Sequence, residues 1–315
     1  MGLTGSSRET IATSARPTVT DEAPALEVVI VAFRCEGLLR DCLTALYQHP
    51  PGRSMSVHVV DNASGDGTAD MVEREFGQVE LTRSAINVGF SAGNNLAIRR
   101  GTAAYVLALN PDTRVTAGSL DRLLALMDSR PEVGVSSPAL VMEDGRPDHA
   151  AKRSFPTPLS ALGHFTGVGR RLSSGPLAEY RAPAVTSGPV DAVNGAFMLM
   201  RRRAIEEVGL FDEGYWMYME DLDLCYVLAR SGWVTWFEPG AEVVHVKAGS
   251  SGLRGPRLAY HFHYGMFRFY RKHYAGERNP LVNAAVYAGI AVKLALSIAR
   301  GSIRRRLGPS PAAGG

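Results

Sequence analysis

The stretch ALEVVIVAF at residues 25–33 is an apolar run, rich in β-branched residues and interrupted only by Glu27. A run of this kind is typical of a strand buried on both faces of a parallel sheet. Leucines at helical spacing follow in 36–47, and a second strand-like segment lies at 56–60. The alternation continues with helices expected at 68–76 and 91–100 and strands expected at 79–82 and 105–109.

This alternation predicts an α/β fold with a doubly wound, mostly parallel central sheet flanked by helices. Right-handed crossovers place the loops that follow the strands at one edge of such a sheet, where ligands bind. Three segments come directly after expected strands, namely Phe33-Arg34, Asp61-Asn62 and Asn110-Pro111-Asp112. We therefore expect these segments to meet in one cleft.

The composition is that of a folded globular protein, with 45% hydrophobic and 21% charged residues. These values exclude wholesale disorder, collagen-like repeats and coiled coil. The three cysteines form no CxxC pair, so we expect neither a disulfide scaffold nor a structural zinc site, and a reducing cytosol fits best. Residues 1–24 are polar and lack the apolar core of a signal peptide, which predicts a disordered leader.

The positive charge is concentrated at the C-terminus. Residues 253–315 carry eleven Lys or Arg and one acid, a net charge of +10, whereas residues 1–252 carry −7. Such a tail predicts an anionic partner surface. Nucleic acid is the less favoured partner because no recognised binding motif accompanies the charge.

An apolar segment, 281–299, lies within this tail and is broken by Asn283 and Lys293. Its length approaches the roughly 20 residues that cross a bilayer, but a central lysine favours a helix lying in the membrane interface. We therefore expect 251–315 to be a helical, basic extension that binds the membrane surface. The aromatic and basic stretch 261–272 suits that interface or a pyrophosphate group of a ligand, and it suits an ordinary helix docked on the preceding domain equally well.

Two of the strand-end segments carry acids with two interpretations each. Asp61, in DNASGDGT, suits a hydrogen-bond acceptor for a nucleotide base or ribose, but the same composition caps turns. Asp112, in NPDT, suits Mg²⁺ or Mn²⁺ bound together with a diphosphate, but Asn-Pro-Asp is also a turn sequence. The residues alone leave both choices open.

A third acidic cluster, Glu220, Asp221 and Asp223, follows the aromatic segment 211–219. Desolvation by apolar neighbours raises the pKa of a carboxylate, which suits a general base. A helix N-terminus also favours acids, and the two interpretations are compatible. The segment NVGFSAGNN at 87–95 adds glycines that permit close backbone approach to a ligand, while the GxGxxG and GxxxxGK[ST] fingerprints are absent.

The segments VVIVAF, VVDNASGDGT, NVGFSAGNN, LALNPDT, GAFMLMRR and FDEGYWMYMEDLDLCYVLARSGW occur in an order that resembles family-2 glycosyltransferases of the GT-A fold. The resemblance covers about residues 26–275 and is nearest to rhamnosyltransferase-like members that build lipid-linked cell-envelope glycans. It implies a catalytic domain at 25–250 and an inverting transfer of a sugar, with dTDP-L-rhamnose as the expected donor. The implied acceptor is a polyprenyl-linked or other cell-envelope glycan, reached from the inner face of the cytoplasmic membrane.

The resemblance also implies roles for single residues. The base and ribose of the donor would be held by Phe33, Arg34, Asp61 and Asn62. The same pocket would be shaped by Asn87, Gly89 and Asn94. Glu220 would orient the acceptor or Asp221, and Asp221 would be the catalytic base. Lys247 and Arg153 are candidate neighbours of the diphosphate.

The implied cofactor is Mn²⁺ or Mg²⁺. Asp112 corresponds to the last acid of the family's DxD metal motif, whereas Asn110 replaces the first acid and would lie beside the donor. His245 matches a position that supplies a metal ligand in some relatives. A strand-end histidine with a local partner explains it equally well.

Two other functions remain open from the sequence. A nucleotidyltransferase uses a similar sheet, but the aromatic stretch before Glu220 and the lack of a glycine-rich basic loop after the first strand argue against it. A non-catalytic nucleotide- or glycan-binding module would tolerate Asp221→Asn. The sequence leaves the oligomeric state open, a homodimer included.

Overall fold

The computed structural model describes residues 23–156, 186–247 and 256–306. The expected leader, except for its last two residues, lies outside the described residues. So do the middle of the expected loop at 144–189 and parts of the expected extension at 251–315.

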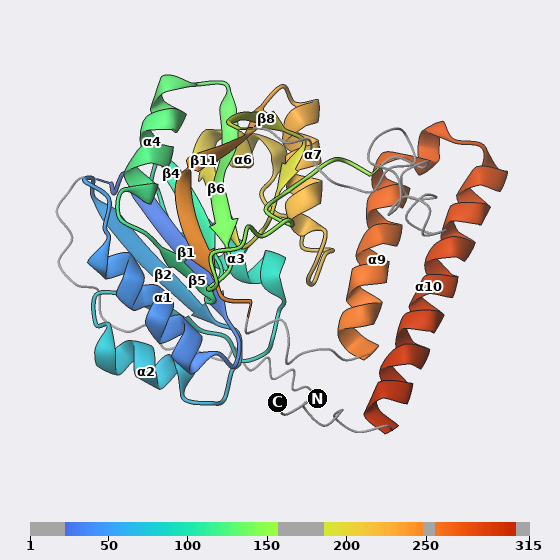
Figure 1. Cartoon of the computed structure of the whole chain (residues 1–315), viewed down its shortest axis with the longest axis horizontal. Helices are drawn as coiled ribbons and strands as arrows, with labels where there is room; N and C mark the ends of the chain where they lie inside the picture. The colour runs from blue at the N-terminus through green and yellow to red at the C-terminus, as the bar shows by residue number, and fades with distance from the viewer. Residues whose placement is uncertain (1–22, 157–185, 248–255, 307–315) are drawn as a thin grey trace, which may run out of the picture.

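The structure confirms the strands and helices expected in the first third of the chain. They are β1 (Leu26–Ala32), α1 (Glu36–Gln48), β2 (Met55–Asp61), α2 (Thr68–Glu75), β3 (Glu80–Arg83), α3 (Phe90–Ile98) and β4 (Tyr105–Leu109). β1 pairs in parallel with both β2 and β4, and β2 pairs in parallel with β3. The carboxyl ends of β1, β2 and β4 therefore share one edge of the sheet (Figure 1).

Further elements, which the sequence patterns did not delimit, complete the sheet. They are β5 (Thr113–Val115), α4 (Ser119–Ser129), β6 (Val133–Val141), β8 (Gly188–Val190), β10 (Phe197–Arg201), α6 (Arg202–Val208), α7 (Glu220–Arg230) and β11 (Val234–His245). The strand order is β3-β2-β1-β4-β10-β6-β11-β5, with β8 beside β11. Only β10, β5 and β8 run against the other strands described, so the sheet is mostly parallel, as expected.

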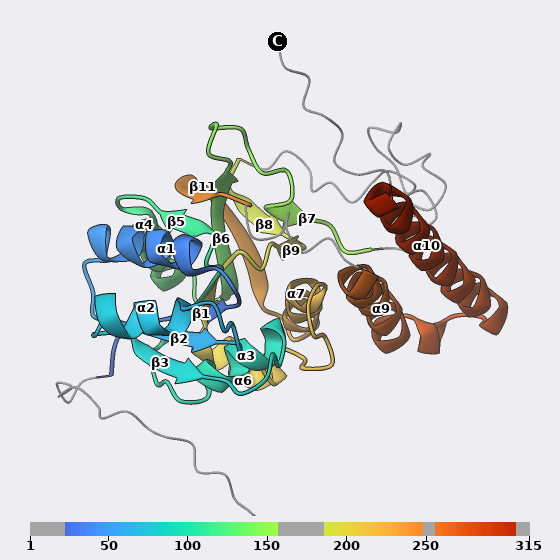
Figure 2. The same cartoon turned by 90° about the horizontal axis from the view of Figure 1, so that it is seen from below.

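Helices cover both faces of this sheet, and side chains alternate between two cores. One core joins the sheet to α1, α2 and α4 and includes Val28 and Ile30. The other joins it to α3, α6 and α7 and includes Val29. Figure 2 shows α1 and α4 on one side of the strands and α3 and α6 on the other. The doubly wound arrangement explains why the first strand is apolar at successive positions.

A buried ion pair lies between β1 and α6. Arg202 Nη2 donates to Glu27 Oε2 over 2.5 Å, and the two side chains are only 11% and 5% exposed. Arg202 also donates to the backbone carbonyl oxygens of Ala103 and Ile98. Burial, opposed by the charge of Arg202, raises the pKa of Glu27 to about 7.

We expect Arg202→Met to destabilise the protein by about 3–5 kcal/mol, because it leaves Glu27 and two carbonyl oxygens buried without their donor. Urea unfolding followed by circular dichroism measures this loss. Arg203→Met is the matched control, since Arg203 is exposed and should change the free energy of unfolding by about 0.5 kcal/mol or less. Equal stability of the two variants would contradict a stabilising role for the ion pair between Arg202 and Glu27.

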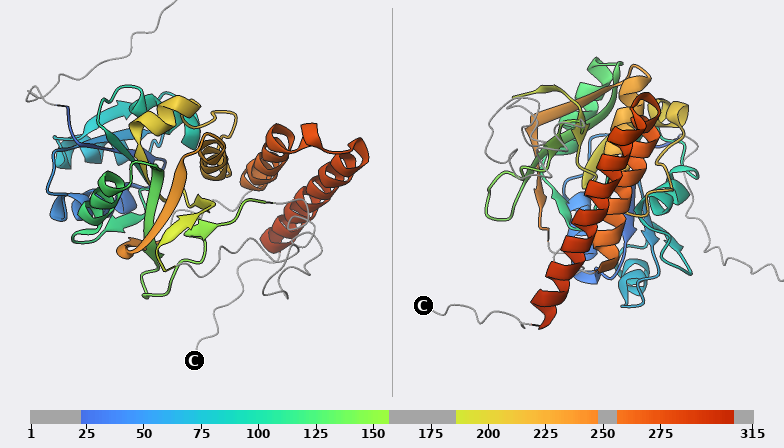
Figure 3. Two further views of the ribbon diagram at one scale, coloured as in Figure 1. Left: turned by 90° about the horizontal axis from the view of Figure 1, so that it is seen from above. Right: turned by 90° about the vertical axis from the view of Figure 1, so that its right-hand side faces the viewer.

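The C-terminal part is a helical hairpin of α9 (Pro256–His273) and α10 (Pro280–Arg306), joined by the 3₁₀ turn Ala275–Glu277. Figure 3 shows the two helices side by side at one flank of the molecule, and Figure 2 places α9 next to α7. The described part of the expected extension is therefore helical. By length and composition, residues 280–301 are long and apolar enough to cross a membrane.

Candidate active site

The site begins where β1 and β2 end side by side. The N–H of Asn62 donates to the carbonyl oxygen of Ala32 over 2.8 Å. The N–H of Arg34 donates to Ser64 Oγ over 3.0 Å, and the Arg34 guanidinium lies 5.2 Å from the centre of the Phe33 ring. The candidate base and ribose residues thus lie together at the carboxyl edge, namely Phe33, Arg34, Asp61 and Asn62.

The side-chain amide of Asn62 fixes the segment 87–89 against this edge. Its Nδ2 donates to Asn87 Oδ1 and to the carbonyl oxygen of Gly89, each over 3.1 Å. Its Oδ1 accepts from the N–H of Val88 over 2.8 Å. Because the amide is used within the protein, we expect Asn62 to build the pocket wall while its neighbours contact the ribose.

Gly89 joins this pocket to the loop that precedes α7. Its φ of +90° favours glycine, and an added Cβ would lie 2.4 Å from the carbonyl oxygen of Trp216. The N–H of Phe90 donates to that same carbonyl over 2.7 Å, and Trp216 Nε1 donates to the carbonyl oxygen of Asn87 over 3.3 Å. Residues 87–90 and Trp216 therefore pack as one unit.

Asn94, also expected in the pocket, is 1% exposed. Its Nδ2 donates to the carbonyl oxygen of Phe90 over 2.9 Å, within α3. This hydrogen bond stabilises the helix behind the pocket, which makes any effect of Asn94 on the donor indirect.

The base candidate Asp221 is connected to the turn after β4. Its Oδ2 accepts from the N–H of Gly195 over 2.8 Å. The next residue, Ala196, accepts the N–H of Asn110 on its carbonyl oxygen over 2.9 Å. Asp112 follows two residues after Asn110, so residues 195–196 connect Asp221 of α7 to the turn that carries Asp112.

Asp112 faces His245 at the ends of β5 and β11. His245 Nε2 lies 3.5 Å from Asp112 Oδ1, and His245 Nδ1 lies 3.0 Å from Asp148 Oδ2. Asp148 also accepts from Lys247 Nζ over 2.6 Å. Burial lowers the pKa of His245, but the two carboxylates outweigh it and raise the pKa to about 9. Burial alone would raise the pKa of the Asp148 carboxyl. The hydrogen bonds from His245 and Lys247 outweigh burial and hold this pKa well below the usual range.

Asp112 and His245 fit a divalent cation in their donor chemistry. Asp112 Oδ1 is buried without a hydrogen-bond partner, and a histidine held at its other nitrogen by a carboxylate is the common form of a metal ligand. A cation at Nε2 would displace the proton that the carboxylates favour. Within residues 23–156, 186–247 and 256–306, no group of three or more His, Cys, Asp or Glu side chains could hold a metal ion. Diphosphate and water would therefore have to supply the other ligands.

Four of the nine buried side-chain polar atoms that lack a hydrogen-bond partner in the described residues belong to residues predicted for the site. Among the described residues they include Asp61 Oδ1, Asp112 Oδ1, Glu220 Oε2 and Arg153 Nε. Folded proteins leave few such atoms unpaired, so their presence in residues predicted from sequence indicates a ligand site. Burial, together with the charges of Asp66, Asp112 and Asp61, raises the pKa of the Cys35 thiol to about 12.

The N-terminus of α7 combines strain with a buried acid. Tyr218 and Met219 have positive φ angles of 72° and 74°, which non-glycine residues rarely adopt. Burial and the charge of Asp221 raise the pKa of Glu220, the next residue. Such strain is concentrated at functional sites. Glu220 thus combines a helix terminus with a buried acid of raised pKa, and Asp221 is buried in the same first turn.

Helix α9 packs against α7 through charged contacts. Lys272 Nζ lies 2.8 Å from Asp212 and 2.7 Å from Asp223, and His273 Nε2 lies 2.6 Å from Asp223. The ring of His261 stacks on Trp216 with centroids 4.4 Å apart. Docking on the domain therefore explains much of the stretch 261–272.

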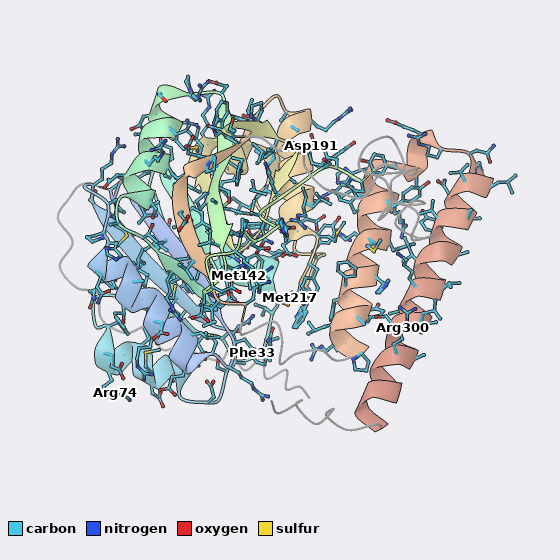
Figure 4. All side chains as sticks on the ribbon, viewed as in Figure 1. Phe33, Arg74, Met142, Asp191, Met217 and Arg300 are labelled. Carbon is cyan, nitrogen blue, oxygen red and sulfur yellow. The ribbon has the colours of Figure 1, made fainter. Side chains whose placement is uncertain are left out.

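The labelled side chains in Figure 4 locate the site. Phe33 and Met217 lie at the same end of the sheet as Met142, whereas Arg74 lies on α2 and Arg300 on α10.

Two residues near the site make contacts that could not be predicted from the sequence. No sequence pattern indicates a role for Asp148, since it lies in a glycine- and proline-rich stretch without periodicity. Arg153 is expected beside the diphosphate, and the structure shows that it pairs with Asp221.

Comparison with known proteins agrees with this architecture. The family model for Glycosyl transferase family 2 matches residues 27–209. The N-acetylglucosaminyl-diphospho-decaprenol L-rhamnosyltransferase of Mycobacterium tuberculosis (strain H37Rv) is 32% identical over 269 residues, which are 80% of this chain and 86% of that protein. Rhamnosyltransferase WbbL of Escherichia coli (strain K12) is 28% identical over 50% of this chain and 60% of its own.

Solved structures share the fold. The mannosyltransferase PcManGT from Pyrobaculum calidifontis, in complex with GDP-Man and Mn²⁺, superposes with a TM-score of 0.54 at 18% identity over 93% of this chain and 78% of its own. GalNAc-T7 with UDP, GalNAc and Mn²⁺ gives a TM-score of 0.53 at 16% identity, over 72% of this chain and 44% of its own. The fold is thus that of the GT-A glycosyltransferases. The chain belongs to glycosyltransferase family 2, and its relatives place it among the rhamnosyltransferase-like members.

Proposed function

We propose that the protein is an inverting glycosyltransferase that moves L-rhamnose from dTDP-L-rhamnose to a polyprenyl-diphosphate-linked sugar. The observation that supports the proposal is the link from Asp221 through residues 195–196 to Asn110, which connects the candidate base to the turn that carries the candidate metal ligand Asp112. The rhamnose and the diphosphate-linked acceptor follow the name of the mycobacterial relative, whose alignment covers 80% of this chain, and dTDP as the nucleotide follows the family resemblance.

In this mechanism, Phe33, Arg34 and Asp61 bind the base and ribose at the edge of the sheet. Asp221 takes the proton of the acceptor hydroxyl as its oxygen attacks the anomeric carbon from the face opposite the diphosphate. A single displacement inverts the anomeric centre and needs no covalent sugar–enzyme intermediate. General-base catalysis of this kind contributes about 10²–10⁴-fold to the rate.

Asp112 and His245 would hold a divalent cation, with Asp148 orienting His245. When bound, the cation stabilises the negative charge that develops on the departing diphosphate. Asn110, next to the same turn, is neutral and would lie beside the donor without adding a charged ligand.

A thermal-shift panel of dTDP-, UDP- and GDP-sugars, each with and without Mn²⁺, tests the donor class. A ligand at 100 times its Kd stabilises the folded state by about 2.7 kcal/mol. We expect dTDP-L-rhamnose to raise the melting temperature only when Mn²⁺ is present. Indifference to every nucleotide sugar would contradict the proposal.

The hairpin of α9 and α10 would hold the enzyme on the inner face of the cytoplasmic membrane. Val292 and Leu296 of α10 are 58% and 49% exposed, and Tyr260 and Phe262 of α9 are 49% and 41% exposed. The described part of the hairpin contains Glu277 as its single acid. Apolar side chains beside basic residues favour an anionic lipid surface, and the central Lys293 favours a helix lying in the interface over one that spans the bilayer.

We expect Val292→Glu combined with Leu296→Glu to weaken binding to anionic phospholipid vesicles more than about tenfold. The double substitution removes apolar area that would be buried in the membrane, and it adds negative charge that the anionic lipids repel. Vesicle co-sedimentation at increasing salt measures the change. Ile86→Glu is the control, since Ile86 is 67% exposed but lies on the loop before α3. Unchanged binding of the double variant would contradict the membrane role of α10.

A further inference from the structure

Arg153 is the charged partner of the base candidate. It lies on β7 (Lys152–Arg153), which pairs antiparallel with β9 (Ala192–Val193). Its Nη2 donates to Asp221 Oδ2 and, over 3.0 Å, to the carbonyl oxygen of Val193. Arg153 thus ties the side chain of Asp221 to the backbone segment that leads to Gly195.

The two carboxylate oxygens of Asp221 accept different numbers of hydrogen bonds. Oδ2 accepts from Arg153 and from the N–H of Gly195, so both of its lone pairs are used. Oδ1 accepts from the N–H of Leu222 over 2.7 Å, so one of its lone pairs remains. A carboxylate oxygen offers two acceptor positions, and Oδ1 is therefore the oxygen that can take a proton.

Arg153 also balances the charge at the start of α7. Glu220 and Asp221 are consecutive carboxyl groups that are 6% and 7% exposed. The charged or titratable groups that act on Arg153 are Asp221, Cys225 and Glu220. Without a positive partner, the negative charge of Asp221 would remain buried and uncompensated beside Glu220.

We propose that Arg153 is a positioning residue that anchors Oδ2 of Asp221, so that Oδ1 faces the acceptor hydroxyl. The proposal rests on the proposed glycosyl transfer. In that step Oδ1 takes the hydroxyl proton, the acceptor oxygen bonds to the anomeric carbon, and the bond from that carbon to the diphosphate oxygen breaks. The electron pair leaves with the nucleoside diphosphate, and Arg153 stays on Oδ2 throughout.

Steady-state kinetics of Arg153→Met test this role. We expect kcat to fall about 10²-fold, because a misplaced catalytic group costs about that factor. The KM for dTDP-L-rhamnose and the thermal shift that it produces should stay at wild-type values, since Arg153 does not hold the donor. Added guanidinium ion at non-denaturing concentration should restore part of kcat, whereas sodium chloride at equal ionic strength should not.

Lys152→Met is the matched control on the same strand. The Nζ of Lys152 lies 4.6 Å from the centre of the Phe237 ring. We expect Lys152→Met to keep the wild-type kcat, and we expect added guanidinium ion to leave its kcat unchanged. If Arg153→Met does not fold, Arg153→Lys carries the test, because it keeps the charge but not the fork geometry. A reduced kcat at unchanged donor KM in Arg153→Lys supports the proposal.

Wild-type kcat in either Arg153 variant would overturn the inference. So would a raised donor KM at unchanged kcat, because it would place Arg153 on the diphosphate. These outcomes are distinct from failure of the proposed function, in which the wild-type protein itself transfers no sugar.

Discussion

Replacing Asp221 by Asn should lower kcat about 10²–10⁴-fold while the protein still binds its donor. The amide keeps the size of the carboxylate and can still accept the N–H of Gly195, so the backbone link to Asn110 should survive. It cannot take the proton of the acceptor hydroxyl. Transfer of labelled sugar measures the rate, and the thermal shift with dTDP-L-rhamnose and Mn²⁺ measures donor binding.

Asp223→Asn is the matched control for this prediction. Asp223 is a carboxylate on the same helix, but it pairs with Lys272 and His273 of α9. We expect this variant to lower the melting temperature and to leave kcat of the folded enzyme close to the wild-type value. Full activity of Asp221→Asn would favour the non-catalytic binding module over the transferase.

The second large effect concerns Asp112. Asp112→Asn should weaken Mn²⁺ binding and lower kcat/KM at least about 10²-fold, because a cation contributes several kcal/mol to the charged transition state and each 1.36 kcal/mol is a factor of ten. Its Oδ1 is buried and faces Nε2 of His245 at 3.5 Å, so the substitution removes the negative charge from the candidate metal position. Titration of Mn²⁺ by electron paramagnetic resonance measures binding directly.

Asp144→Asn is the control for the metal prediction. Asp144 lies on the same stretch as Asp148, but it is exposed and pairs with Arg146. This variant should bind Mn²⁺ like the wild type. Wild-type Mn²⁺ affinity in Asp112→Asn would contradict the metal site, and full activity in the presence of a chelator would contradict a metal requirement.

The sequence predicted the first half of the sheet well because its signals are local. The apolar run at 25–33 predicts a buried strand, and the spacing of the leucines in 36–47 predicts a helix with one buried face. β10 and β11 were not delimited, since their places depend on long-range pairings: β10 lies antiparallel between β4 and β6, and β11 carries a register shift between Glu238 and Glu242. No local pattern encodes such pairings.

The site residues show the same difference between local signals and long-range contacts. Asp61, Asp112 and Asp221 could be predicted because each lies in a distinctive segment at the end of a strand or the start of a helix. Asp148 and the true partner of Arg153 could not, since their roles arise from contacts over 97 and 68 residues of sequence. Carboxylates that hold a histidine or accept from an arginine have no spacing rule in sequence.

Product analysis tests the central claim most directly, which is that one pocket joins an activated-sugar donor to a base on α7. The purified protein is incubated with Mn²⁺, dTDP-L-rhamnose and a polyprenyl-diphosphate-linked N-acetylglucosamine, and the products are followed by mass spectrometry and NMR. We predict one rhamnose added to each acceptor, one dTDP released for each transfer, and an inverted anomeric configuration. Release of dTMP with a phosphorylated product, retention of configuration, or no consumption of any nucleotide sugar would contradict the account.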